Sequence, residues 1–283
     1  MDQNSGDKQY IQGILKNQEG QIIEYKFERG QLLQQTQFGD FYKFSNIDLQ
    51  EVLIAKIIPK SKITTNRIKQ QVLQEIRIYQ KITHQNILKF CGTFEDKDYL
   101  YILLEDFQQS LCDYLRQQKN ISEDKAILYF AQIVDALYYL HENNIMHRDL
   151  KLSNIYFTKD QQLKIGGFNY AIQLEQKQER RKSICGTSQY LAPDILQNED
   201  GYSLKVDIWY LGIILYRLLY SVHPFQADDI KSAYQNIKTT KYKLREEVKI
   251  SQNIKDLIDQ LLNADPNKRP SIEKIREFCQ VLN

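Results

Sequence analysis

The stretch His147-Arg148-Asp149-Leu150-Lys151-Leu152-Ser153-Asn154 decides how this sequence is interpreted. It places a carboxylate, an ammonium group and an amide on its third, fifth and eighth residues. A helical pattern precedes it over residues 122–143, where Ser122 is followed by two acidic residues and then by an apolar run. This order is typical of a capped helix N-terminus. The stretch is therefore expected to form a polar loop after a long helix.

The chain differs in character on the two sides of residue 105. Before it, short alternating segments predict strands at residues 10–15, 21–27, 31–38, 39–45, 51–58, 87–94 and 99–104. A turn is expected at residues 17–20 and one helix at residues 64–81. After Gln109, helical patterns dominate, at residues 111–118, 122–143, 205–221, 228–238, 254–262 and 272–282. The sequence thus predicts a small part rich in sheet, followed by a larger helical part.

The composition fits a folded protein and argues against several classes. Of 283 residues, 42% are hydrophobic and 26% are charged, which allows a sizeable core. The formal charge of +2 argues against a dedicated nucleic-acid binder, because such proteins are usually distinctly basic. The four cysteines lie far apart without a C-x-x-C pair, so a zinc site or a disulfide framework is not expected. Thiols in a reducing compartment are the default.

No targeting or membrane segment is expected. The first ten residues, MDQNSGDKQY, are polar and do not resemble a signal peptide. The longest apolar run, Ile208–Tyr220, contains Arg217 and is too short to cross a bilayer, so it predicts a buried helix. We expect an intracellular protein, cytoplasmic or cytoskeletal, with protein partners and without nucleic-acid or membrane partners.

The loop at residues 147–154 resembles the H-R-D-L-K-x-x-N catalytic loop of the eukaryotic protein kinases. The order of family motifs continues around it, in Lys56, Glu75, Ala192-Pro193-Asp194, Asp207-Ile208-Trp209-Tyr210-Leu211-Gly212 and Arg269. The resemblance covers about residues 26–282 and implies an α+β fold with two lobes. These would be a small antiparallel β lobe with one helix, residues 26–105, and a large mainly helical lobe, residues 106–283. Residues 1–25 would form an extension that adds a hairpin or docks a partner.

Within the kinases, the chain looks most similar to the Polo-like Ser/Thr group. The stretches Phe94–Asp98, His147–Asn154 and Glu179–Thr187 carry this resemblance. It places Ser183 where that group has its activating phosphosite. A phosphate there would be expected to bond to Arg148 and order the loop. The alternative is an exposed and unmodified serine.

The resemblance also implies the residues of an active site. Asp149 and Lys151 take the catalytic positions, and the ATP pocket positions are Lys56, Glu75, Leu104 and Asn154. In an active kinase, Asp149 would orient the acceptor hydroxyl, while Lys151 and Lys56 would contact phosphates. Asn154 would hold a magnesium ion.

The sequence departs from the family at the metal site. Where the family has D-F-G, this chain has Gly167-Phe168-Asn169. The missing carboxylate is the principal ligand of the magnesium ion that bridges the phosphates of ATP. Glycine has no side-chain oxygen, and Asn169 is neutral and two residues away. No metal site is therefore expected.

Two further departures concern ATP itself. In the phosphate-binding loop, Gln34 and Thr36 replace glycines that let the backbone approach phosphates. In the adenine pocket, Phe41, Ile54 and Tyr156 are each larger than the family residue. Adding carbons to a packed site costs about 1–3 kcal/mol. We therefore expect these three side chains to fill the pocket.

The departures converge on one ligand, magnesium-bound ATP, and favour a catalytically inactive kinase homologue, or pseudokinase. It would act as a scaffold, as an allosteric partner of a true kinase, or as a structural subunit of a large assembly, with no cofactor. One alternative is an active ATP-dependent protein Ser/Thr kinase that uses ATP and magnesium. A second is a regulator that binds nucleotide without magnesium.

Overall fold

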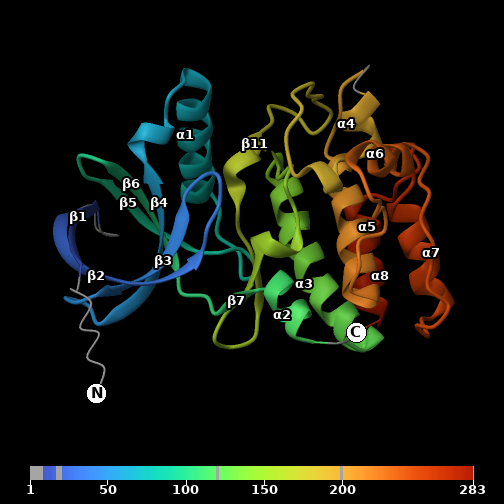
Figure 1. Cartoon of the computed structure of the whole chain (residues 1–283), viewed down its shortest axis with the longest axis horizontal. Helices are drawn as coiled ribbons and strands as arrows, with labels where there is room; N and C mark the ends of the chain where they lie inside the picture. The colour runs from blue at the N-terminus through green and yellow to red at the C-terminus, as the bar shows by residue number, and fades with distance from the viewer. Residues whose placement is uncertain (1–8, 17–20, 119–120, 198–199, 283) are drawn as a thin grey trace. The chain divides into compact units, whose positions relative to one another are not determined.

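A computed structural model describes residues 9–16, 21–118, 121–197 and 200–282. The chain divides into two compact units (Figure 1). The first unit contains the described residues up to Thr83 together with Leu88–Gln108, and the second contains His84–Ile87 and the described residues from Gln109 onward. The predicted turn at residues 17–20 lies outside the described residues.

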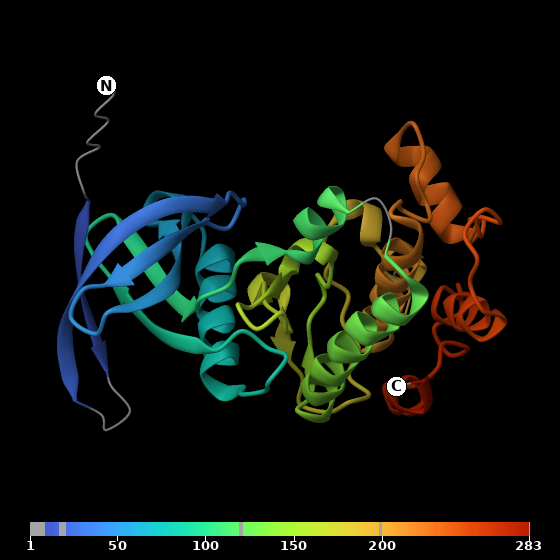
Figure 2. The ribbon, with the colours of Figure 1, turned by 90° about the horizontal axis from the view of Figure 1, so that it is seen from below.

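The first unit is built on a six-stranded sheet in the order β1-β2-β3-β4-β6-β5. All neighbouring strands are antiparallel. The strands are β1 (Tyr10–Lys16), β2 (Ile22–Gln34), β3 (Asp40–Asn46), β4 (Glu51–Pro59), β5 (Phe90–Glu95) and β6 (Tyr99–Glu105). Its helices are the short 3-10 turn η1 (Lys60–Lys62) and α1 (Asn66–Lys81). The helix α1 begins after Thr65, whose hydroxyl accepts a hydrogen bond from the Ile68 amide. Figure 2 shows α1 beside the strands in a second view.

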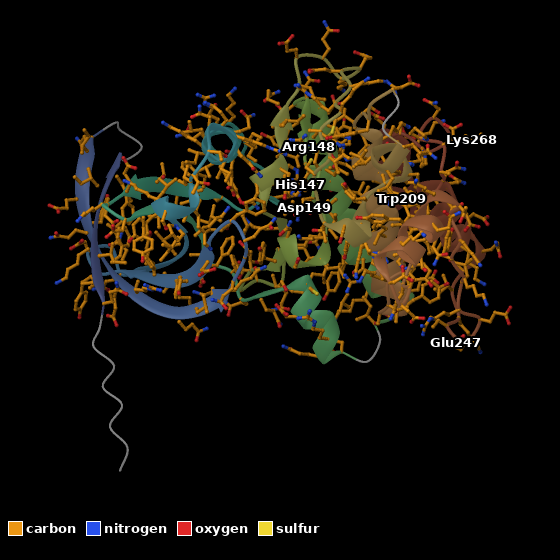
Figure 3. All side chains as sticks on the ribbon, turned by 45° about the horizontal axis from the view of Figure 1, so that its top comes forward. His147, Arg148, Asp149, Trp209, Glu247 and Lys268 are labelled. Carbon is orange, nitrogen blue, oxygen red and sulfur yellow. The ribbon has the colours of Figure 1, made fainter. Side chains whose placement is uncertain are left out.

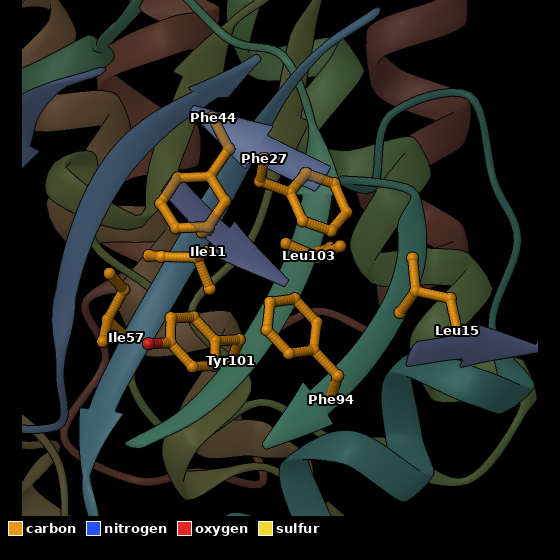
Figure 4. Close-up of a cluster of buried hydrophobic side chains, with 9 residues drawn as sticks. Ile11, Leu15, Phe27, Phe44, Ile57, Phe94, Tyr101 and Leu103 are labelled. Atoms are coloured by element: carbon orange, nitrogen blue, oxygen red, sulfur yellow. The ribbon is translucent and has the colours of Figure 1, made fainter. Parts of the chain in front are cut away.

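An aromatic cluster forms the core on one face of this sheet (Figure 4). The ring of Phe94 stacks on Phe27 at 5.5 Å and on Tyr101 at 4.4 Å between ring centroids. From the N-terminal strand β1, Ile11 and Leu15 add their side chains to the same cluster. Alternation along β1 buries these two residues and leaves Ile14 60% exposed.

The strand β2 differs from the sequence prediction, which placed two strands at residues 21–27 and 31–38. One strand, Ile22–Gln34, runs through the expected break. Its register against β3 shifts between Arg29 and Leu32, which is a β-bulge. Gly30 lies there, and a Cβ atom at this position would be 3.1 Å from the Lys43 carbonyl oxygen. The glycine therefore permits close approach of two strands instead of ending one.

The second unit is mainly helical. Its principal helices are α2 (Leu111–Gln117), α3 (Glu123–Glu142), α4 (Pro193–Gln197), α5 (Lys205–Tyr220), α6 (Ile230–Lys238), α7 (Gln252–Leu261) and α8 (Ile272–Leu282). Its strands are short: β7 (Gln109–Ser110), β8 (Ile145–Met146), β9 (Ile155–Phe157), β10 (Leu163–Ile165) and β11 (Ile172–Gln173). The short 3-10 turns are η2 (Leu152–Asn154), η3 (Phe168–Tyr170) and η4 (Ser188–Tyr190). Sheet in one unit and helix in the other confirm the α+β class.

The helix α5 lies at the centre of the second unit. It is buried along nearly its whole length because apolar residues occur on every side of it. Among the described residues, no helix combines the length and the apolar character that crossing a membrane requires. The apolar run at residues 208–220 thus forms a core helix, as its length predicts.

Candidate active site

The catalytic-loop motif lies between β8 and β9 and is anchored to the start of α5. The two carboxylate oxygens of Asp207 accept hydrogen bonds from the backbone amides of His147 and Arg148, both at 2.9 Å. The His141 ring also contacts this carboxylate, at 3.0 Å. These bonds hold Arg148 at a φ of 64°, an unusual backbone for a residue with a side chain. Figure 3 shows His147, Arg148 and Asp149 close together in the second unit.

Burial and hydrogen bonding determine the protonation states of Asp207 and His147, which support this loop. Burial acts to raise the pKa of Asp207, but hydrogen bonds and charges of its neighbours, first His141 and then His147, outweigh it and lower the pKa. Burial lowers the pKa of His147. Its Nδ1 accepts from the Asp149 amide at 3.3 Å, so the ring proton is on Nε2, 3.0 Å from the Gly166 carbonyl oxygen. The loop is therefore supported by an ionised Asp207 and a neutral His147.

Asp149 is 4% exposed, and its carboxylate is held by three neighbours. Its Oδ1 accepts hydrogen bonds from the Thr187 amide at 3.0 Å and from the Thr187 hydroxyl at 2.7 Å. Its Oδ2 lies 3.0 Å from the ammonium of Lys151 and 3.2 Å from the amide nitrogen of Asn154. The fold thus brings together the predicted residues Asp149, Lys151 and Asn154, all within the second unit.

Gly167 replaces the metal-binding aspartate of the family, and the surrounding space is closed. Its φ of 75° is left-handed. A Cβ atom built there would lie 2.5 Å from the Cγ of Asn154. The Asn154 side chain is held in that place because its amide nitrogen donates to the Asp149 backbone carbonyl at 2.8 Å. Asn154 therefore occupies the space that a side chain at residue 167 requires.

In the first unit, Lys56 and Glu75 form a buried ion pair. The Lys56 ammonium donates to both carboxylate oxygens of Glu75, at 2.8 and 2.7 Å. The two side chains are only 2% and 3% exposed. The ring of Phe38 lies with its centroid 6.0 Å from the same ammonium. Two of the ATP pocket positions are therefore joined to each other, between β4 and α1.

The loop between β2 and β3 is closed by hydrogen bonds of its own. The Thr36 hydroxyl donates to the Gly39 carbonyl at 2.6 Å and accepts from the Phe38 amide at 3.2 Å. The Thr36 amide donates to the Asp40 carboxylate at 3.3 Å, and the Gly39 amide donates to the Thr36 carbonyl at 3.4 Å. The amides of Thr36, Phe38 and Gly39 thus already have acceptors within the loop.

Ser183, the candidate phosphosite, lies against the arginine of the catalytic loop. The Arg148 guanidinium donates to the Ser183 hydroxyl at 2.9 Å and to the Tyr202 hydroxyl at 3.1 Å. Tyr202 in turn donates to the Ser183 carbonyl at 2.6 Å. Arg148 therefore links the catalytic loop to the segment that contains Ser183.

The remaining motif residues and the predicted adenine-pocket residues are divided between the two units. Two of the motif residues, Asp194 and Arg269, form an ion pair at 2.6 Å. Phe41 packs against Phe107 at 6.3 Å between centroids in the first unit, where Leu104 pairs with Ile54 across β6 and β4. Tyr156 lies on β9 in the second unit, opposite Lys164. That Phe41, Ile54 and Tyr156 together fill an adenine pocket stays a prediction.

Two groups of contacts were not anticipated from the sequence. Thr187 supplies two hydrogen bonds to Asp149, and in the sequence it is marked only by its place in the Polo-like stretch. Asp40 closes the loop of Thr36 by accepting from its backbone amide, and no sequence signal predicts this contact. Both are contacts between segments whose approach depends on loop geometry.

Comparison with known proteins identifies the class. A family model for the protein kinase domain matches residues 27–279. Together with the two units and the anchored loop, this shows that the chain belongs to the protein kinase family.

Its relatives place it more narrowly. It is 39% identical over 251 residues to a probable serine/threonine-protein kinase, CCRP1, of Zea mays, an alignment that covers 88% of this chain and 40% of that one. It is 39% identical over 253 residues to the probable serine/threonine-protein kinase PLK of Dictyostelium discoideum, covering 89% and 26%. To the cell cycle serine/threonine-protein kinase CDC5/MSD2 of Saccharomyces cerevisiae it is 37% identical over 254 residues, covering 89% and 36%. The chain thus spans less than half the length of these relatives. They confirm the resemblance to Polo-like Ser/Thr kinases.

Proposed function

We propose that this chain is a pseudokinase, a kinase homologue that does not transfer phosphate from magnesium-bound ATP and that works by binding another protein. The observation that carries the proposal is the pair Gly167 and Asn154. The family's metal-binding carboxylate is absent, and the Asn154 side chain fills the space where it would stand.

The residues around Gly167 do not fit a magnesium ion. Magnesium requires hard oxygen ligands in octahedral geometry, usually one or two carboxylates. Gly167 has no side-chain carboxylate. The side-chain amide nitrogen of Asn154 faces Asp149, to which it donates two hydrogen bonds. Asp149 itself already accepts from Thr187 and lies beside the Lys151 ammonium. A cation bound here would have to break these contacts, and it would gain only one carboxylate ligand, that of Asp149.

The loop between β2 and β3 also supports the proposal. Backbone amides bind phosphate when they are free to donate to it. Here the amides of Thr36, Phe38 and Gly39 donate within the loop. The carboxylate of Asp40 takes part in this closure and would repel a phosphate group. Phosphate binding would therefore need the loop to open.

The retained features support a binding role. The Lys56–Glu75 pair and the Asp207 anchor still form, so contacts that shape a kinase are preserved although the metal-binding carboxylate is missing. We also propose Ser183 as a phosphosite for a partner kinase, because the Arg148 guanidinium already touches its hydroxyl. A phosphate there would gain charge-assisted bonds to that arginine.

A thermal-shift measurement tests the main proposal. A ligand that binds only the folded state at about 100 times its Kd adds about 2.7 kcal/mol of stability. We expect no rise in Tm with ATP, either with magnesium or with EDTA. A kinase that binds ATP, measured in parallel, controls for the assay. A shift that occurs in EDTA as well as in magnesium would instead favour a nucleotide-binding regulator.

The second candidate function is an active protein Ser/Thr kinase. The comparisons by themselves favour it, since the relatives are named as Ser/Thr kinases. The held carboxylate of Asp149, with Lys151 beside it, is the observation in the structure that favours it. In that case ATP and magnesium would together raise the Tm, and labelled phosphate would pass to a protein substrate. Asp149→Asn would abolish the transfer while leaving the fold intact.

A further inference from the structure

A short segment of the second unit, residues 241–245, lies between α6 and the turn before α7 (Figure 1) and forms neither helix nor strand. Exposure alternates along it. Its three basic residues are exposed, whereas Tyr242 and Leu244 between them are half-buried. A period of two is typical of an extended backbone, in which successive side chains point to opposite faces. The segment therefore has a cationic outer face and an inner face that packs on the unit.

Tyr242 anchors the inner face. Its ring meets the rings of Tyr216 and Phe225 edge to face, with centroids 5.9 and 5.6 Å apart. Its hydroxyl donates a hydrogen bond to the carboxylate of Asp259 on α7. The position of the segment is thus set by packing before any partner binds.

One edge of the segment's backbone has hydrogen-bond partners and the other has none. In an extended chain, the N–H and C=O groups of alternate residues point to the same edge. On the first edge, the Lys241 amide donates to the Asn236 carbonyl at 2.8 Å, and the Lys243 carbonyl accepts from the Tyr216 hydroxyl at 2.7 Å. The second edge belongs to the two half-buried residues. Their amides and carbonyls have no hydrogen-bond partner in the part of the chain that the structure describes, so this edge is open to a further strand.

The outer face carries cations with little compensating charge. Lys241 and Lys243 form no ion pair with any residue that the structure describes. Arg245 lies 4.0 Å from the carboxylate of Glu247, which Figure 3 labels, and both side chains are exposed. An exposed pair at this distance contributes little. Because the three cations are two residues apart, they match acidic residues at every second position of a neighbouring strand.

A hollow of about 400 Å³ borders the inner face. Tyr242 and Leu244 line it on one side, and residues from the end of α7 onward, Leu262, Asn263 and Ala264, line it on the other. Polar and apolar groups are thus mixed in its walls. It suits a short β-branched side chain with a hydroxyl, such as that of threonine.

We propose that residues 241–245 bind an extended acidic segment of a protein partner, which pairs with them as an antiparallel strand. Its backbone would bond to the amides and carbonyls of Tyr242 and Leu244, and its alternate carboxylates would face Lys241 and Lys243. The free carbonyls favour a peptide, because they require N–H donors, which the phosphodiester backbone of a nucleic acid lacks. The assignment does not depend on the proposed loss of catalysis, since none of these residues belongs to the candidate active site.

The experiment uses the whole chain labelled with ²H and ¹⁵N and follows the backbone amide signals of Tyr242 and Leu244. The probe is acetyl-Glu-Thr-Glu-Thr-Glu amide, and its matched control is acetyl-Gln-Thr-Gln-Thr-Gln amide. We expect the glutamate peptide to shift both signals saturably and to slow their hydrogen exchange, and the glutamine peptide to bind about tenfold more weakly or less. Equal affinity for the two peptides would overturn the acidic partner. Oligouridine that shifts these signals at a lower concentration than the peptide does would assign the segment to nucleic acid instead.

A backbone test separates strand pairing from attraction between charges alone. Directly opposite residues of an antiparallel pair have their side chains on the same face. The two threonines of the probe therefore lie opposite Tyr242 and Leu244, and their N–H groups bond to the open edge. N-methylation of both threonines should abolish binding, whereas N-methylation of the central glutamate, whose N–H points away, should leave it nearly unchanged. Undiminished binding of the threonine-methylated peptide would refute strand pairing.

Charge reversal tests the side chains. Lys241→Glu combined with Lys243→Glu should abolish binding of the glutamate peptide and create binding of acetyl-Lys-Thr-Lys-Thr-Lys amide. Lys249→Glu is the control, because Lys249 is exposed but lies outside the segment and should keep wild-type affinity. A melting curve for each variant shows whether it folds. A folded double variant that binds the glutamate peptide as tightly as the wild type does would contradict the assignment.

Discussion

Gly167 has a left-handed backbone and no side chain. The absence of a side chain leaves room for the side chain of Asn154. The Asn154 amide turns toward Asp149 and fills the space above Gly167. Restoring an aspartate at residue 167 would therefore require Asn154 to move as well. The loss of the carboxylate and the position of Asn154 are thus coupled by packing.

The buried pair of Lys56 and Glu75 supports a prediction at the same scale. Lys56→Met should lower the free energy of unfolding by about 3–5 kcal/mol, because it leaves the Glu75 carboxylate buried without its partner. Lys56→Met combined with Glu75→Leu should recover most of this loss, since no charge remains buried. Urea unfolding monitored by circular dichroism measures both values. A single variant as stable as the double variant would show that the pair is dispensable.

The strand β1 acts as a cover for the aromatic cluster of the first unit. It pairs with β2 along its whole length and packs on β5. Two glycines make the close approach possible. A Cβ atom at Gly13 would lie 2.8 Å from the Phe94 ring, and one at Gly92 would lie 3.0 Å from the Leu15 side chain. The strand β1 therefore contributes to the core of this unit.

Substitutions in β1 test this role. Ile11→Ala and Leu15→Ala should each lower the free energy of unfolding by about 2–5 kcal/mol, because each leaves a cavity beside the aromatic rings. Ile14→Ala, on the exposed side of the same strand, is the matched control and should change it by about 0.5 kcal/mol or less. Urea unfolding gives the values, and hydrogen exchange locates the loss in the sheet. Equal effects at residues 11 and 14 would contradict the burial of β1.

For the molecule as a whole, buried and partly buried histidines link stability to pH. Burial lowers the pKa of His84, His147 and His223 in the folded chain. Below pH 6.5 the unfolded chain therefore binds more protons than the folded chain, and folding becomes less favourable. Asp207 acts in a lower pH range. Its pKa in the folded chain is depressed below 3.8, so its contribution to stability is present above pH 3.8 and is lost as the pH falls from there through the folded pKa.

We expect the free energy of unfolding to fall as the pH decreases from 6.5 to about 4. For His223, whose pKa falls from 6.5 to about 4, the loss is at most about 3 kcal/mol. His223→Gln should flatten this part of the curve, since glutamine does not titrate. Urea unfolding at several pH values between 4 and 7.5 provides the measurement. A variant with the wild-type slope would assign the pH dependence to other groups.

Much of the fold could be predicted because its elements depend on local pattern. Alternating residues predicted the strands, and the buried helix at residues 205–220 followed from its apolar run. The bulge at Gly30 was missed because glycine also marks turns, and only the partner strand decides between the two. The five-residue helix Pro193–Gln197 was not predicted, since so short an element has too few residues to show a period.

For the candidate site, the sequence alone determined which groups are present, above all Asp149 and the missing carboxylate at residue 167. Residue identity is enough for this because a metal ligand is either in the chain or absent from it. Only the tertiary structure decided how those groups are used: that Thr187 holds Asp149 and that Asn154 fills the space at Gly167. These contacts join residues far apart in the chain, and packing brings them together in a way that no local pattern encodes.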